Sequence, residues 1–180
     1  KITYDAQAYF PLGKDFVLRG YGKLGYGNDL PFYKNFYAGG FGSVRGYDNS
    51  TLGPKYDSVY AENTGLENFD PEEVGGNALV QFGTELALPL PFKGDWTRQV
   101  RPVLFAEGAQ VFDTQCDVPT SEASKQYCKD NFGFELDNMR YSVGVGFTWI
   151  TMIGPLSLSY AYPLNDKDGD ETKNIQFEIG

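Results

Sequence analysis

The sequence contains no histidine among its 180 residues, only two cysteines, and no long hydrophobic run. Without histidine, the side chain that most often acts as a general base near neutral pH is missing. A transmembrane helix needs about 20 consecutive, mostly apolar residues, and no segment approaches that length. Basic residues are also few: 15 Lys and Arg stand against 24 Asp and Glu, a net charge of −9. This charge argues against nucleic acid as a partner, because phosphates require a basic face.

Glycine and aromatic residues, in contrast, are abundant. There are 22 Gly, and aromatic side chains make up 16% of the chain. Glycine is unfavourable inside helices and aromatic residues are favoured in strands, so the composition predicts an all-β fold. The chain begins at Lys1 without Met or a signal peptide and ends at Gly180 within an alternating run. We therefore expect it to be part of a longer protein.

Apolar side chains recur at every second position in several segments. Residues 140–149, RYSVGVGFTW, alternate apolar or aromatic side chains with small or polar ones. The same alternation occurs in residues 2–10, 16–26, 80–90, 156–162 and 174–179. A period of two places successive side chains on opposite faces of a strand. Residues 100–113 alternate poorly, but with them the sequence predicts about seven strands.

The connections between these strands alternate in length. The short ones are residues 11–15, 91–98 and 152–155, and the long, polar ones are residues 28–77, 114–138 and 163–173. Antiparallel strands with tight turns at one end, long loops at the other and apolar outer faces are typical of a transmembrane antiparallel β-barrel. Because an open sheet leaves free edges, we expect the missing strands upstream of this chain.

A soluble sandwich or barrel with a dry core is the alternative, in which the apolar side chains would point inward. Two features count against it. The polar faces of the predicted strands are rich in glycine and poor in lysine, unlike most solvated sheet faces. Aromatic residues also gather near strand ends, as they do in the interfacial girdles of membrane barrels.

The two cysteines, Cys116 and Cys128, lie in a polar stretch with no His and no other Cys to complete a zinc site. We predict a disulfide across an exposed loop, which implies an oxidising compartment such as the periplasm or the cell surface. Two free thiols in the cytosol are the alternative. If the bond forms, it closes a loop of about 13 residues, which the chain-entropy model values at roughly 3 kcal/mol.

Two motif matches do not support a cofactor or metal. Gly20, Gly22 and Gly25 match the spacing of a dinucleotide fingerprint, but no helix follows to bind the phosphates. Residues 165–171 resemble a calcium loop, but the glycine is misplaced and Phe177 stands where the bidentate acid belongs. We expect neither group. The acidic run 57–73 is interpreted as a solvated external loop, with contacts to divalent cations or lipopolysaccharide as open alternatives.

Residues 36–55, FYAGGFGSVRGYDNSTLGPK, contain the tetrad Val44, Arg45, Gly46 and Tyr47. This segment closely resembles the signature loop of the BamA family of outer-membrane-protein assembly factors, whose tetrad is Val-Arg-Gly-Phe/Tyr. The resemblance continues through GGNALVQFGTELALPLPF to the final GPLSLSYAYPLNDKDGDETKNIQFEIG. Two features depart from the family pattern: Tyr47 replaces the more usual Phe, and no terminal aromatic residue follows Gly180. Two-partner secretion transporters share the tetrad, but its flanks favour the BamA family.

The resemblance implies that this loop folds back into the barrel lumen, where Arg45 meets acidic side chains of the inner wall. Glu85 and Glu107 match the family positions that receive the arginine, and Glu85 lies on the small, polar face of its strand. A guanidinium group forms parallel hydrogen bonds with carboxylates, and the neighbouring glycines allow the sharp backbone path. We therefore predict that Arg45 pins the loop; an arginine exposed in a surface loop is the alternative.

The resemblance also implies a function. The chain would form the C-terminal part, about seven strands, of a sixteen-stranded barrel in the outer membrane of a Gram-negative bacterium, with the POTRA domains outside it. The whole protein would fold and insert other outer-membrane proteins without covalent chemistry. Its expected partners are outer-membrane lipids, unfolded outer-membrane protein clients and assembly-machinery lipoproteins. A two-partner secretion transporter that exports a polypeptide through the barrel is the alternative, and an enzyme is disfavoured without His or an evident Ser–acid pair.

The last predicted strand, residues 173–180, would form one side of a lateral seam with the first strand of the barrel. An unpaired strand edge can template pairing with a client strand. Alternation directs three of its side chains to lipid and three to the lumen. The seam residues are Asn174, Ile175, Gln176, Phe177, Glu178, Ile179 and Gly180.

Overall fold

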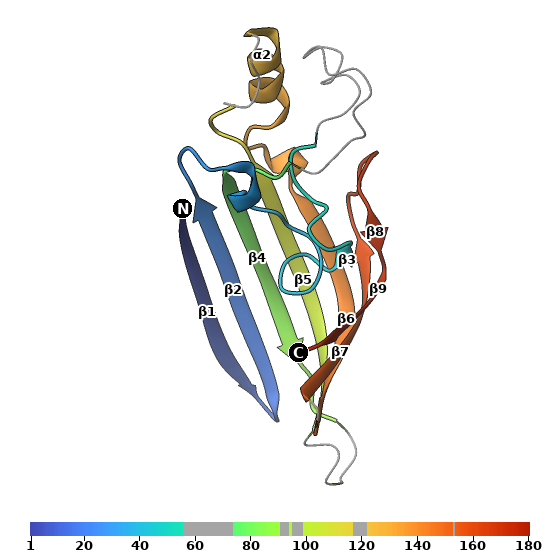
Figure 1. The fold of residues 1–180 in the computed structure, drawn as a ribbon. Helices are drawn as coiled ribbons and strands as arrows, with labels where there is room; N and C mark the ends of the chain where they lie inside the picture. Colours follow the sequence, from blue (N-terminus) through green and yellow to red (C-terminus); the bar gives the residue numbers. More distant parts are fainter. Residues whose placement is uncertain (56–73, 91–93, 95–98, 117–121, 153) are drawn as a thin grey trace.

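The computed structural model describes residues 1–55, 74–90, 94, 99–116, 122–152 and 154–180 (Figure 1). Seven strands form one antiparallel sheet in the order β1-β2-β4-β5-β6-β7-β9. The bounds of these strands are β1 Ile2–Gly13, β2 Phe16–Tyr26, β4 Ala78–Ala87, β5 Val100–Phe112, β6 Arg140–Thr151, β7 Gly154–Pro163 and β9 Ile175–Ile179. Each strand pairs with its neighbours along the chain, so the sheet is a meander. The predicted all-β fold is confirmed.

The remaining elements are short. A second sheet pairs β3 (Gly46–Tyr47), in the long connection 28–77, with β8 (Thr172–Lys173), in the long connection 163–173. The described residues also include two 3-10 helices: η1 (Phe32–Lys34) in the same connection as β3, and η3 (Leu136–Asn138) in the connection between β5 and β6. Within the described ranges, no helix is both long and apolar enough to cross a membrane.

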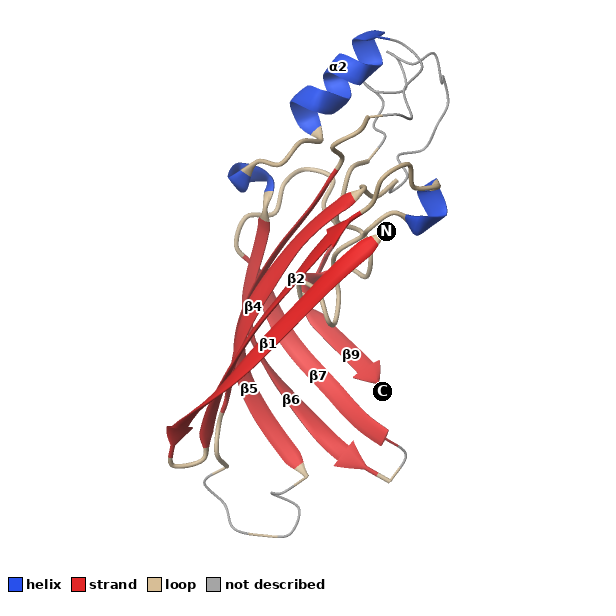
Figure 2. Cartoon of the chain, turned by 90° about the vertical axis from the view of Figure 1, so that its left-hand side faces the viewer, coloured by secondary structure: helices blue, strands red, loops and turns tan. Residues whose placement is uncertain are grey.

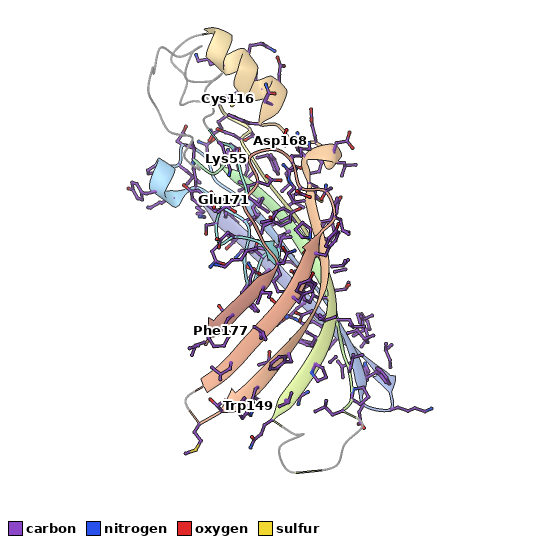
Figure 3. All side chains as sticks on the ribbon, turned by 90° about the vertical axis from the view of Figure 1, so that its right-hand side faces the viewer. Lys55, Cys116, Trp149, Asp168, Glu171 and Phe177 are labelled. Carbon is purple, nitrogen blue, oxygen red and sulfur yellow. A yellow bond between two sulfur atoms is a disulfide. The ribbon has the colours of Figure 1, made fainter. Side chains whose placement is uncertain are left out.

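Short turns and long connections lie at opposite ends of the sheet. The turns between β1 and β2 and between β6 and β7 are at one end, whereas the described parts of the long connections leave from the other (Figures 1 and 2). Trp149 lies near the end with the short turns and Cys116 near the opposite end (Figure 3). Most of the 91–98 connection and the acidic run 57–73 fall outside the described residues.

The two faces of the strands differ as alternation predicted. On β9, the side chains of Ile175, Phe177 and Ile179 are 64%, 60% and 61% exposed, whereas the intervening Gln176 is 5% exposed. On β6, Val145 and Trp149 are exposed and Ser142 is buried. An apolar outer face is what contact with lipid requires.

The buried apolar cluster lies between the sheet and the long connection after β2. Residues of that connection pack against β4 and β5; the cluster contains Phe36, Ala38, Val44, Tyr47, Leu52, Leu79, Ala109 and Val111. A soluble sandwich would instead bury the apolar side chains that point outward here. The loop thus supplies the lumenal packing, and the sheet curves around it (Figure 2).

The position of the loop also explains why β5 alternates poorly. Phe105, Ala109 and Val111 point toward the lumen and are buried there, although they are apolar. A lumenal face in contact with water should be polar, but the loop covers this part of the face and removes that requirement. The irregular pattern of residues 100–113 is therefore a consequence of tertiary packing.

Several strand bounds differ from the prediction. The strand expected over 80–90 spans Ala78–Ala87, β1 continues to Gly13 within the expected turn 11–15, and the last strand spans Ile175–Ile179 within the expected 173–180. The connection 114–138, predicted as a loop, contains the helix α2 (Glu122–Asn131). Its sequence, EASKQYCKDN, is almost entirely polar and so has no apolar stripe by which a helix could be recognised.

Candidate functional site

The tetrad reaches the inner wall of the sheet along a backbone path that requires glycine. Gly46 has a φ of 95°, and a Cβ atom at this position would lie 3.2 Å from the Cβ of Ala161 on β7. Residues other than glycine rarely adopt this φ, and a distance of 3.2 Å between the two Cβ atoms would be shorter than in usual packing. The loop therefore passes close to β7 at Gly46, and this places Arg45 opposite β4 and β5.

The structure brings Arg45 together with both predicted acids. The Nη2 atom of Arg45 lies 2.6 Å from Oε1 of Glu85 and 2.5 Å from Oε1 of Glu107. Its Nε donates to Glu107 Oε1 at 2.9 Å, and its backbone N–H donates to Glu107 Oε2 at 2.8 Å. The side chains of Arg45 and Glu107 are only 7% and 1% exposed. Val44, the residue before Arg45, is fully buried in the apolar cluster.

An aromatic ring completes the pocket around the guanidinium group. The Cζ atom of Arg45 lies 3.5 Å from the ring centroid of Phe105 on β5. This distance corresponds to a cation–π contact, which is stronger when desolvated. Burial alone would lower the pKa of Arg45, but hydrogen bonds and charge from Glu107, and then from Glu85, raise it above its ordinary value. The arginine is therefore held as a cation inside the barrel wall.

Two further side chains of β2, which sequence reasoning missed, bind the same acids. Arg19 Nη1 lies 2.9 Å from Glu85 Oε2, and Tyr21 Oη donates to Glu107 Oε1 at 2.5 Å. The register brings Arg19 opposite Glu85, and Gly83 separates Tyr21 from Glu107. A Cβ atom at Gly83 would lie 2.5 Å from Cζ of Tyr21, so glycine leaves room for the ring to cross β4.

The network balances two arginines against two glutamates. Glu107 receives three donors from Arg45 and one from Tyr21, whereas Glu85 is shared between Arg45 and Arg19. Buried carboxylates need this number of donors, because an unpaired buried charge is costly. The register of β2 against β4 is what identifies Arg19 and Tyr21 as members.

The other side of the tetrad contacts the end of the chain. Gly46 and Tyr47 of β3 pair with β8, and the backbone N–H of Asp48 donates to the carbonyl of Glu171 at 2.8 Å. The side chain of Gln176 on β9 donates through Nε2 to the Tyr47 carbonyl at 2.6 Å. Tyr47 is buried, and burial, followed by the charge of Asp170, raises its pKa to about 12. The loop thus joins the middle of the sheet to its last strand.

The remaining seam residues lie along β9 and at its ends. Asn174 donates to the carbonyl of Ala161 at 2.9 Å, and the N–H of Gly180 donates to the carbonyl of Pro155 at 3.0 Å. Glu178 is exposed on the lumenal face, opposite Ser157 of β7. Among the described residues, β7 is the single strand that pairs with β9.

The structure joins Cys116 and Cys128 in a disulfide, with their Cα atoms 5.8 Å apart. The stretch between them was expected to be a loop, but Cys128 lies in α2; both cysteines are 2% exposed. Asp113 lies close to the two sulfur atoms, but its Oδ1 accepts hydrogen bonds from the backbone N–H groups of Gln115 and Cys116. Sulfur atoms bonded to each other are not thiolate ligands, so this group is structural.

An antiparallel meander with an apolar outer face and an ion-paired loop on its inner face defines a segment of a transmembrane β-barrel with an inward-folded loop. The chain belongs to the Omp85 superfamily, whose domain matches residues 1–180. Members of this family are outer-membrane proteins of Gram-negative bacteria, so the predicted location is confirmed.

The chain is similar in sequence to two curated proteins, each named outer membrane protein assembly factor BamA. The protein of Neisseria meningitidis serogroup B is 37% identical over 192 residues, which cover 99% of this chain and 23% of the relative. That of Nitratidesulfovibrio vulgaris is 25% identical over 190 residues, covering 100% of this chain and 20% of the relative. The chain therefore spans less than a quarter of the length of either relative.

A solved structure shows the same arrangement of strands. The chain is similar to BamA from Haemophilus ducreyi lacking POTRA domains 1–3, with a TM-score of 0.79 and 34% identity. The match covers 97% of this chain and 33% of that structure. The similarity identifies the chain as part of a BamA-type barrel, as the sequence predicted.

Proposed function

We propose that this chain is the C-terminal part of the barrel of an outer-membrane protein assembly factor, and that the whole protein folds and inserts other β-barrel proteins. The observation that carries the proposal is 37% identity to such a factor along 99% of the chain. The ion pairs of Arg45 with Glu85 and Glu107 support it, because they hold the signature loop inside the barrel. The same relatives favour assembly over polypeptide secretion, the alternative function.

The proposed activity needs no covalent step. β9 is five residues long, half the length of β7, and its second edge has no strand partner among the described residues. In the whole barrel that edge would pair with the first strand. A short ladder opens more readily than a long one, and the exposed N–H and C=O groups would then template a client strand.

The proposed partners follow from the two faces of this strand. Ile175, Phe177 and Ile179 lie on the apolar outer face, where they would contact outer-membrane lipids. Unfolded outer-membrane protein clients would pair with the backbone of β9. Assembly-machinery lipoproteins would bind mostly through regions outside this chain, and the complete barrel would have sixteen strands with POTRA domains attached.

A reversible lock at the seam tests this function. We would replace Glu178 with Cys in the full-length protein, together with the facing residue of the first barrel strand, because Gln176 is already hydrogen-bonded to the loop. The oxidised barrel should fold but insert no client in proteoliposomes, and reduction should restore insertion. Insertion at the unlocked rate would show that the seam does not open.

A matched disulfide one strand away controls for the effect of crosslinking. Thr148 and Ser157 face each other on β6 and β7, and their hydroxyl oxygens are 3.1 Å apart. Ser157 also lies opposite Glu178, so the control is at the same height in the barrel. Thr148→Cys with Ser157→Cys should crosslink two strands that never separate, and client insertion should stay at the wild-type rate in oxidising conditions.

A further inference from the structure

Gln176 makes two contacts with the backbone of the tetrad. Its Nε2 donates to the carbonyl of Tyr47 at 2.6 Å, and its Oε1 accepts from the N–H of Gly46 at 3.4 Å. Gln176 is 5% exposed and is the second residue of β9, between two side chains that point outward. A primary amide donates through its nitrogen and accepts through its oxygen, so it can bridge a backbone C=O and a backbone N–H.

These contacts continue the ionic network without a gap. Glu107 binds both the side chain and the backbone N–H of Arg45, and the next two residues, Gly46 and Tyr47, bind Gln176. The loop cannot shift easily between these two points, because Gly46 packs against Ala161 of β7. The anchor on β5 and the contact on β9 are therefore separated by a single rigid peptide segment.

We infer that Gln176 is a positioning residue that tethers the last strand to the pinned loop. The tether keeps β9 against β7 and the lumenal loop when its other edge separates from the first strand. The inference rests on the proposed function for its role in client insertion, but the tether itself is a property of the barrel alone. Because it consists of neutral hydrogen bonds, it is weaker than the ionic anchor at Glu107 and is the contact that yields first.

Two exposed side-chain contacts also join the loop to this end of the chain. Lys55 Nζ donates to the carbonyl of Gly169 at 2.8 Å, and Lys173 Nζ lies 3.4 Å from Asp48 Oδ1, with side chains that are 52% and 36% exposed. Exposed ion pairs contribute little to stability. Within the described part of the chain, Gln176 is thus the buried side chain of β9 that binds the loop directly.

The chain offers a matched control for a substitution at this position. Gln81 on β4 is 6% exposed, and its Nε2 donates to the carbonyl of Gly42 in the same loop at 2.7 Å. Gln81→Met removes one glutamine–loop hydrogen bond and Gln176→Met removes two, and both substitutions keep a similar side-chain volume. They differ in the strand from which the contact is made.

The experiment is hydrogen exchange of the full-length protein in lipid bilayers, followed by mass spectrometry of residues 174–180. With Gln176→Met, exchange of the β9 amides should be about five- to tenfold faster, the scale of losing the shorter of its two hydrogen bonds, the one to Tyr47. With Gln81→Met it should match wild type. Gln176→Asn, which keeps the amide but shortens the side chain, should act as Gln176→Met does. Equal β9 exchange in the Gln176 and Gln81 variants would overturn the inference.

A second variant tests whether the tether depends on the anchor. Arg45→Gln should also accelerate exchange of the β9 amides, and adding Gln176→Met to it should produce little further change, because both substitutions break one connection. If the increase in β9 exchange in the double variant equals the product of the increases in the two single variants, the coupling is refuted.

Client insertion in proteoliposomes separates this inference from the proposed function. If both hold, Gln176→Met should change the insertion rate and Gln81→Met should not. If Gln176→Met accelerates β9 exchange but the wild-type protein inserts no client, the tether is supported and the proposed function is contradicted. If the wild-type protein inserts clients but Gln176→Met leaves β9 exchange unchanged, the proposed function is supported and the tether is contradicted.

Discussion

The central strands β4 and β5 and the last strand β9 are held to the same loop by different chemistry. At β4 and β5, a buried guanidinium group binds two carboxylates, and each strand also has a ladder on both sides. At β9, a neutral amide binds two backbone groups, and the ladder is five residues long on one side. The same loop is therefore bound to β4 and β5 by buried ion pairs and to β9 by neutral hydrogen bonds.

The difference in bond type decides which end yields. Hydrogen bonds to charged groups contribute about 1.5–3 kcal/mol each, against about 0.5–1.5 kcal/mol for neutral ones. Breaking the ionic end would also leave Glu107 buried without its cation. Any motion that needs a free last strand would therefore break the contact at Gln176 and leave Arg45 in place.

Removing the cation should have the largest effect. Arg45→Ala should lower the free energy of unfolding by about 3–5 kcal/mol, because it leaves a buried charge without its partner. Urea unfolding of the folded barrel, followed by gel mobility without heating, would measure it. Arg45→Lys, which restores a charge without the planar fork, should recover only part of the loss. A variant as stable as wild type would refute the role of Arg45 as the pin.

The two acids should differ from each other. Glu107→Gln should cost about 2–3 kcal/mol, because four donors converge on a carboxylate that is 1% exposed. Glu85→Gln should cost about 1 kcal/mol, since its side chain is 19% exposed and accessible to water. The same unfolding assay ranks the two variants, and a reversed order would place the anchor on β4 instead of β5.

Substitution of a loop glycine tests how much the backbone conformation of the tetrad and its packing on β7 each contribute to stability. Gly46→Ala should cost about 1–3 kcal/mol, because it combines a φ of 95° with close packing on Ala161. Gly42→Ala has a similar φ of 76° but no atom within 4 Å of the added Cβ, so it measures the backbone strain alone. We expect the Gly42 variant to lose less stability. Equal losses would mean that packing on β7 does not hold the tetrad.

Loss of the disulfide should have the smallest effect on the sheet and on client insertion. Replacing Cys116 and Cys128 with Ser should change client insertion by less than about twofold, although closure of this loop stabilises it by roughly 3 kcal/mol. The loss should be confined to α2 and its flanks, where amide exchange would rise. Thiol labelling of intact cells without reductant checks the bond itself, because labelled cysteines would contradict it. A large loss of insertion would connect this loop to the seam.

Local patterns determined the strands, their faces and the order of turns and loops. Alternation has a period of two wherever a strand separates lipid from lumen, so it is written in neighbouring residues such as those of 140–149. Arg45, Glu85 and Glu107 were identified through a family resemblance, and their charges made the pairing physically reasonable. β5 was the exception among the strands, because its lumenal face packs against a loop distant in sequence.

Only the tertiary structure decided which further side chains join the site. Arg19 and Tyr21 reach the acids through the register of β2 against β4, and Gln176 reaches the loop because the chain returns to it 129 residues after Tyr47. α2 has no apolar stripe, and one of its residues forms a disulfide. For Arg19, Tyr21 and Gln176 the partner is far away in sequence, and a glutamine facing a lumen has the same local pattern whether it meets water or a loop. Position in space, set by register and by the path of the glycine-rich loop, made that choice.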